Sequence, residues 1–158
     1  MEPVPIDAYE AGGQILRDAV AGLTADQFRW VPPAEAGIGL WSVHQVVVHV
    51  ADSDDVSIHR MKRIIAEPNP LLLGYDESAF ARSLYYHEQP VEDALARLKL
   101  GRRAFSGVLR RLPPAAFART GVHSERGLVR LGDLVADYVR HVDDHVRYIR
   151  LKRDALGA

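Results

Sequence analysis

The sequence of 158 residues contains no cysteine. This absence excludes disulfide bonds, thiolate metal ligands and a nucleophilic sulfur carried by the protein itself. Histidine, aspartate and glutamate are left as the strong metal ligands. Any reaction of this protein that uses a thiol therefore needs a thiol that comes with the substrate.

An excess of charge of one sign is also lacking, because 20 lysine and arginine residues stand against 21 aspartate and glutamate residues. The formal net charge is -1. A protein that binds nucleic acid needs a broad basic surface against the phosphate backbone. The charge balance therefore argues against a nucleic-acid partner.

Long hydrophobic runs are absent as well. No uninterrupted apolar stretch approaches the ~20 residues that span a bilayer, since even residues 46–51 are interrupted by His49. Residues 1–11 are acidic and lack the basic start and the apolar run of a secretory signal. We therefore expect a protein without a membrane partner that stays in the cytoplasm.

What is present is the composition of an ordinary globular protein. Charged residues make up 26% of the chain and hydrophobic residues 47%, and the length suits one domain with a sizeable core. Proline and glycine fall at intervals that separate helices rather than domains. We expect residues 1–158 to form a single domain.

Four long segments show the apolar spacing of α-helices, i, i+3, i+4. They cover approximately residues 6–21, 42–67, 90–112 and 131–156. A shorter helix is predicted over residues 75–84, and Thr24 and Ser42 each begin a capping-box pattern. Four helices of this length pack as a bundle. The predicted fold class is therefore all-α, a four-helix bundle with short extra helices in the connections.

Two histidines lie four residues apart in the last predicted helix. His141 and His145 therefore project from one face, where they can approach a shared ion. Leu134 and Tyr138 fall on the same side and identify it as the inner face. Two protonated rings there would repel each other, whereas a metal ion takes them neutral. Such a pair also occurs as two exposed or hydrogen-bonded rings, so by itself it leaves metal binding open.

His49 adds a third inward imidazole. A helical wheel over residues 42–67 places His49 on the core side and His44 on the opposite side. A lone inward histidine is more often a packed ring bonded to a neighbour, but three of them on two helices favour a metal site. Three imidazoles also leave a coordination position open, as in catalytic sites. We predict that His49, His141 and His145 bind one divalent transition metal ion.

The remaining histidines and one arginine have weaker claims to a role. His44 and His59 are predicted at the surface or the rim, and His87 and His123 in loops exposed to solvent, where they could still line a pocket. Arg60 lies on the same side of its helix as the predicted ligand and could meet an anionic substrate. An arginine that extends along the surface is the commoner case, so we expect Arg60 to be exposed.

Three aspartates lie a turn or less from the predicted ligands. Asp52, Asp137 and Asp144 could orient the imidazoles or accept protons. A solvated charge on a helix face is the commoner role for each of them. The sequence therefore leaves open whether a carboxylate acts as a general base.

Two segments carry a resemblance to a known family. Residues 41–53, WSVHQVVVHVADS, together with residues 138–145, YVRHVDDH, resemble the DinB-like family of metal-binding bundles. The resemblance spans most of the chain, and the loop over residues 120–127 is a weaker part of it. It implies that a histidine of the second long helix joins the histidine pair of the last one to hold zinc or nickel. It also implies a homodimer.

The same resemblance implies either metal-dependent hydrolysis of a small-molecule substrate or transfer of a low-molecular-weight thiol such as bacillithiol or mycothiol. A divalent ion serves both, since it acidifies bound water or holds a thiol as thiolate. A hydrolase needs a carboxylate nearby as general base, whereas a transferase needs polar and cationic groups around the thiol carrier. Two alternatives stay open: a bundle that binds a metal or small ligand in stress response without catalysis, and a structural bundle without metal.

Overall fold

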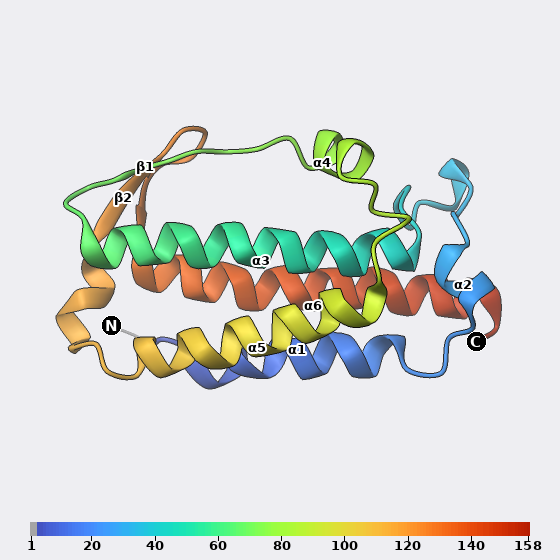
Figure 1. The fold of residues 1–158 in the computed structure, drawn as a ribbon, viewed down its shortest axis with the longest axis horizontal. Helices are drawn as coiled ribbons and strands as arrows, with labels where there is room; N and C mark the ends of the chain where they lie inside the picture. The colour runs from blue at the N-terminus through green and yellow to red at the C-terminus, as the bar shows by residue number, and fades with distance from the viewer. Residues whose placement is uncertain (1–2) are drawn as a thin grey trace.

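In the computed structural model, which describes residues 3–158, four long helices lie side by side as a bundle (Figure 1). They are α1 (Ile6–Val20), α3 (Val43–Ala66), α5 (Val91–Leu109) and α6 (Leu131–Leu156). The connections contain α2 (Ala25–Arg29), η1 (Ala34–Ala36), α4 (Glu77–Ser83) and η2 (Pro114–Ala118). The predicted four-helix bundle with short helices in its connections is confirmed.

The order of the helices around the bundle is unlike that of a simple up-and-down chain. α1 packs against α5 and α6, and α3 packs against the same two helices, so α1 and α3 occupy opposite corners. In Figure 1, α1 and α6 run in one direction and α3 and α5 in the other. The chain between α3 and α5 therefore returns along the length of the bundle. This order places the first half of α3 antiparallel to the middle of α6.

α3 begins with the capping box that the sequence predicts. The Ser42 hydroxyl accepts a hydrogen bond from the backbone N–H of Gln45 at 3.2 Å, and the Ser42 N–H donates to the Gln45 side chain at 3.0 Å. Thr24 and Gln27 form the equivalent box at the start of α2. Such boxes satisfy backbone donors that a helix start leaves free. Because its start is fixed, α3 presents a defined face to the bundle interior.

A three-stranded sheet covers the end of the bundle where α3 ends and α6 begins (Figure 1). β1 (Leu71–Leu72) pairs in parallel with β2 (Thr120–His123), and β2 pairs in antiparallel with β3 (Gly127–Arg130). Residues 120–127, expected as a loop from the sequence, instead form most of a β-hairpin. Strands of two to four residues are too short for alternation to reveal them.

The core consists of two hydrophobic clusters, one toward each end of the bundle. One includes Val47 and Ile149, and the other includes Met61 and Leu134. Along the helices between them lie buried polar side chains, among them Ser53, Asp54, Ser57, Arg102 and Ser106. The interior of the bundle is therefore polar near its middle, where the predicted metal ligands also lie.

Two consecutive glycines let α1 approach α5 closely. A Cβ atom at Gly13 would lie 2.7 Å from the Cα atom of Lys99, closer than real Cβ atoms approach. A Cβ atom at Gly12 would collide with the guanidinium of Arg102. Gly12 therefore leaves the space in which this buried arginine is held.

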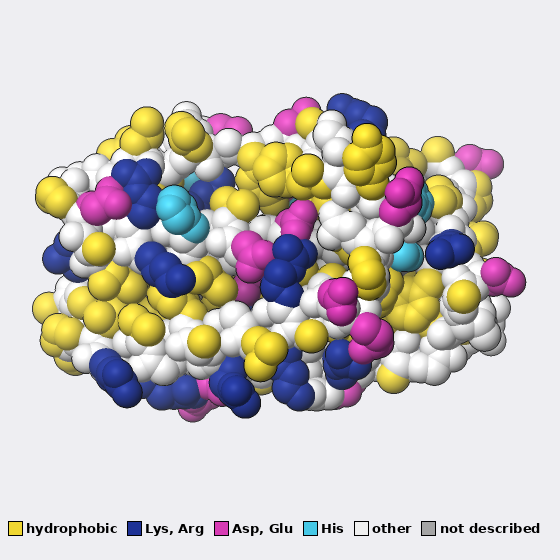
Figure 2. Space-filling view, viewed as in Figure 1, with side chains coloured by type: hydrophobic (Ala, Val, Ile, Leu, Met, Phe, Trp, Pro, Cys, Tyr) yellow, Lys and Arg dark blue, Asp and Glu magenta, His cyan; other side chains and the backbone are white. Residues whose placement is uncertain are grey.

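Basic and acidic side chains are intermingled on the face of the bundle in Figure 2. Lysine and arginine side chains follow its lower edge, and aspartate and glutamate side chains lie among and above them. This face therefore presents mixed charge rather than one large area of a single sign.

No helix within residues 3–158 is long and apolar enough to cross a membrane.

Candidate metal centre

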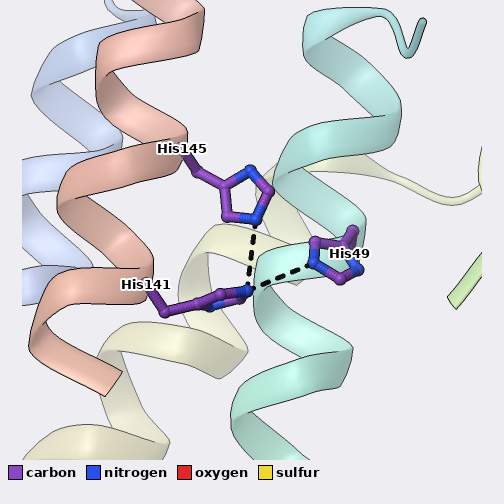
Figure 3. A group of neighbouring side chains, drawn as sticks. All are labelled: His49, His141 and His145. Carbon is purple, nitrogen blue, oxygen red and sulfur yellow. Dashed lines mark hydrogen bonds between the residues drawn. The ribbon is translucent and has the colours of Figure 1, made fainter. Parts of the chain in front are cut away.

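Three imidazoles from two helices point toward one another inside the bundle (Figure 3). His49 projects from α3, and His141 and His145 project from successive turns of α6. Nε2 of His141 lies 3.3 Å from Nε2 of His49 and 3.1 Å from Nε2 of His145. The structure therefore brings together all three histidines that the sequence singled out.

These separations suit the ligands of a single divalent ion. Two imidazole nitrogens bound to a tetrahedral zinc ion at about 2.0–2.1 Å lie roughly 3.3 Å apart, which is close to both Nε2–Nε2 distances. One ring nitrogen of each histidine lies within 4.8 Å of the other two. Within residues 3–158, no other group of three histidine, aspartate or glutamate side chains is close enough to share an ion. The donor set therefore fits a transition metal.

Burial keeps the three imidazoles neutral. His49 is 0% exposed, and desolvation, followed by the neighbouring His145 and His141, lowers its pKa to about 3. Desolvation is also the main cause that lowers the pKa of His141 to about 3 and that of His145 to about 4. A neutral imidazole is the form that coordinates a metal ion. At neutral pH the rings are therefore ready to act as ligands.

The Nδ1 and Nε2 atoms of these rings differ in their surroundings. Nδ1 of His49 and Nδ1 of His141 are buried and have no hydrogen-bond partner within residues 3–158. An unpaired buried polar atom costs about 1–3 kcal/mol. The Nε2 atoms of the three rings, in contrast, converge, and a cation bound among their lone pairs would stabilise this convergence.

Two cavities reach the imidazoles, one at each histidine of α6. A mostly apolar cavity of about 280 Å³ is bordered by His145, Trp41 and Lys152. A polar cavity of about 220 Å³ is bordered by His141 and Arg60. An apolar cavity therefore borders His145, and a separate polar cavity borders His141.

The three aspartates near the ligands are paired with arginines. Asp52 and Asp137 are partly buried, and Asp144 is exposed. Their partners are Arg97 for Asp52, Arg126 and Arg140 for Asp137, and Arg147 for Asp144. None of these three carboxylates is therefore a free general base beside the imidazoles.

His44 does not lie where the sequence analysis expected it. It was expected at the surface or rim, but it is 6% exposed, and its Nε2 lies 2.8 Å from the backbone carbonyl oxygen of Gln89. The physical reason is that the connection ahead of α5 folds over the outer face of α3, which helical periodicity cannot reveal. His59 and His87 are exposed, as expected.

Two residues of the polar cavity were also expected in solvent and are buried. His123 ends β2 and is 6% exposed, and its Nδ1 accepts a hydrogen bond from the Glu125 N–H at 3.2 Å. Arg60 is 8% exposed, because the connection after α3 folds over it and the Leu73 carbonyl accepts its hydrogen bond. The helical wheel placed Arg60 on the same side as His49, but it contains no information about the connection that covers this arginine.

Comparisons with known proteins agree with this geometry. A family model described as the DinB superfamily matches residues 8–149. A protein of Oceanobacillus iheyensis named "Putative metal-dependent hydrolase" is 34% identical over 111 residues, which cover 70% of this chain and 64% of the relative. A Bacillus mycoides protein of the same description is 33% identical over 120 residues, covering 76% and 69%. The matched part of this chain thus spans about two thirds of the length of these curated relatives.

Among solved structures, the chain is similar to YfiT from Bacillus subtilis. The TM-score is 0.88 and the sequence identity 27%, with 96% of this chain and 85% of the other covered. That structure is described as a probable metal-dependent hydrolase with an unusual four-helix bundle topology. Sequence and structure comparisons therefore lead to proteins of one description.

Proposed function

The chain belongs to the DinB superfamily, and from this premise we propose that it is a metal-dependent hydrolase whose His49, His141 and His145 hold one divalent transition metal ion. The observation that carries the proposal is the convergence of three neutral Nε2 atoms in a buried place. Imidazole ligands suit zinc and nickel, the two ions that we propose. Three protein ligands leave a position open for water or substrate.

The residues of the chain prepare the site for hydrolysis in two ways. The ring centroids of Trp41 and His49 lie 4.9 Å apart, and those of Tyr138 and His141 lie 5.5 Å apart. These aromatic contacts hold both imidazoles in place. The two cavities give the parts of a small-molecule substrate separate places beside the imidazoles. When bound, a divalent ion supplies the Lewis acidity that makes water nucleophilic at neutral pH.

Transfer of a low-molecular-weight thiol is the second candidate function. The paired state of Asp52 and Asp137 favours it, because a hydrolase uses a free carboxylate as general base whereas a metal-held thiolate needs none. Arg60 and Lys152 add cationic groups, one in each cavity, that would hold a polar thiol carrier. The chain lacks cysteine, so the thiol would be a separate small molecule.

The metal site is tested by elemental analysis of protein purified without a metal-binding tag. We expect about one equivalent of zinc or nickel per chain, and we expect His49→Ala to lose metal and activity together. His59→Ala is the matched control, because His59 is exposed on the same helix, and it should keep both. Activity retained by a metal-free His49→Ala protein would contradict the mechanism.

The reaction class is tested with the metal-loaded protein and two sets of substrates. Turnover of esters or amides without added thiol is the expected result. Turnover only when bacillithiol or mycothiol is supplied with an electrophile would establish the second candidate instead. A metal-loaded protein that turns over neither set would be a bundle that binds without catalysis.

A further inference from the structure

Arg60 is a buried arginine without a paired carboxylate in the described part of the chain. It is 8% exposed, one Nη atom donates to the Leu73 carbonyl oxygen, and its buried Nε has no hydrogen-bond partner among residues 3–158. No ion pair joins it to a carboxylate within residues 3–158. A buried charge without a partner is unfavourable, so a residue kept in this state indicates a partner from outside the chain.

Other arginines around the bundle show what Arg60 lacks. The fully buried Arg102 lies 2.7 Å from a carboxylate oxygen of Asp54. Arg126, which borders the same cavity as Arg60, lies 2.6 Å from Asp137. Arg60 contacts the face of the Tyr75 ring at 5.9 Å, an interaction that leaves its charge uncompensated. The guanidinium of Arg60 is thus open to an anion that enters the polar cavity.

His123 supplies a second donor at the same cavity. Its Nδ1 accepts the hydrogen bond from the Glu125 N–H, so in the neutral ring the proton lies on Nε2, which then donates. Burial and then the nearby Arg60 lower the pKa of His123, which keeps this ring neutral. A planar guanidinium and an imidazole N–H therefore border one space together with His141.

The carboxylates of the cavity lie toward its opening. Glu77 and Glu125 are exposed, and Asp137 is already paired with Arg126. The buried Arg60 and His123 therefore donate hydrogen bonds into the cavity, and the exposed Glu77 and Glu125 form its negative rim. A phosphate ester, which carries about -1.5 to -2 charges, would be repelled by this rim more strongly than a singly charged carboxylate.

We propose that the polar cavity is an anion subsite in which Arg60, assisted by His123, binds a carboxylate of the substrate. The planar fork of a guanidinium matches the two oxygens of a carboxylate. The cavity of about 220 Å³ borders His141, so a small substrate anchored at Arg60 extends to the histidine cluster. The subsite rests on the proposed hydrolase function in one respect, which is that the bond to be hydrolysed would lie at the three histidines.

The test uses the full chain, both zinc-loaded and chelator-treated, and measures binding of butyrate and of its neutral counterpart butyramide by NMR titration at constant ionic strength. Butyrate should bind at least about tenfold more tightly, which is the effect of a charge-assisted hydrogen bond. In the chelator-treated chain, where no ion can take butyrate as a ligand, Arg60→Gln should remove this preference. Arg126→Gln is the matched control: it removes the same charge from the same cavity and should change butyrate binding less than about threefold.

Several outcomes would overturn the subsite. Equal binding of butyrate and butyramide by the unmodified chain would do so. An equal loss of butyrate affinity in Arg60→Gln and Arg126→Gln would do so as well. Tighter binding of inorganic phosphate than of butyrate would overturn the carboxylate assignment. If Arg60→Gln fails to fold by circular dichroism, Arg60→Lys replaces it. The Lys variant should lose part of the preference because it lacks the fork, and full retention counts against the proposal.

Measurements on the zinc-loaded and the chelator-treated protein distinguish the anion subsite from the proposed metal site. An Arg60-dependent preference in a chain that takes up no zinc supports the anion subsite and removes the hydrolase proposal alone. Zinc uptake with turnover, but without an Arg60-dependent preference, removes the subsite alone.

Discussion

Two polar centres are buried in this bundle, and they meet the cost of burial differently. The guanidinium of Arg102 donates to the Asp54 carboxylate at 2.7 and 2.9 Å and to the backbone carbonyls of Tyr9 and Tyr138 at 2.9 Å. The three imidazoles contact one another through Nε2, and Nδ1 of His49 and of His141 has no hydrogen-bond partner within residues 3–158. The arginine centre also keeps an unpaired buried atom in this range, Asp54 Oδ2. Charge distinguishes the two centres: Arg102 has its counter-ion in the chain, whereas the three converging Nε2 atoms would be stabilised by a cation.

The arginine centre also holds the frame in which the histidines lie. Arg102 projects from α5, and its partners come from α1, α3 and α6, so this one side chain connects all four bundle helices. The Tyr138 carbonyl that it binds lies one turn before His141 on α6. The position of α6 against α3, and with it the distance between His49 and His141, depends on this contact.

The largest expected effect comes from breaking the arginine centre. Asp54→Ala leaves a buried guanidinium without its carboxylate, and we expect the free energy of unfolding to fall by about 3–5 kcal/mol. Urea denaturation of the metal-free protein measures this loss. A double variant, Asp54→Leu with Arg102→Leu, removes both charges and should regain much of it. A loss below about 1 kcal/mol in Asp54→Ala would mean that the pair contributes no more than a surface contact.

An intermediate effect is expected from each single ring of the histidine centre in acid. The folded pKa of His49 is about 3, against an ordinary value of 6.5, so below pH 6.5 the unfolded chain binds a proton that the folded chain refuses. The free energy of unfolding should therefore fall with decreasing pH, by up to about 1.4 kcal/mol per pH unit for each such ring. Above pH 6.5 both states are neutral, and the imidazoles contribute no pH dependence.

The measurement is urea denaturation of metal-free protein between pH 7 and pH 5. His49→Gln should flatten the pH dependence by the share of one ring. His59→Gln, which changes an exposed histidine of the same helix, should leave the slope as it is. Identical slopes for the unmodified chain and His49→Gln would show that this imidazole is protonated in the folded state.

The smallest expected effect comes from an exposed counterpart of Arg102 on the same helix. Arg97 pairs with Asp52 at 2.7 Å and with Asp55 at 3.1 Å, but 41% of its side chain is exposed. Arg97→Gln should lower the free energy of unfolding by less than about 1 kcal/mol, because solvent screens such pairs. Urea denaturation beside Asp54→Ala makes the comparison. Similar losses in both variants would show that burial does not set the strength of these pairs.

The features that were predictable from the sequence are those set by local periodicity. The four helices, the capping boxes and the inward side of His49, His141 and His145 all follow from spacing within one segment. Metal binding by these histidines, the homodimer and the cytoplasmic location stay predictions.

The features that were not predictable depend on contacts between distant segments. Leu71 of β1 pairs with Val122 of β2, far along the chain, and neither strand is long enough to show a pattern. The burial of His44, Arg60 and His123 likewise comes from connections that fold over the bundle. The helical wheel describes one helix at a time and contains no information about such cover.

The chain that returns from α3 to α5 forms one wall of the polar cavity. Leu73 receives the hydrogen bond of Arg60, and Gly74 and Tyr75 border the cavity, whereas Leu72 and Tyr86 of the same connection are buried in the hydrophobic core. Substitutions at residues 73–75 can therefore reshape the cavity, whereas the buried residues of the connection contribute to the core. One connection thus serves both the cavity and the core, and the two uses fall on different residues of it.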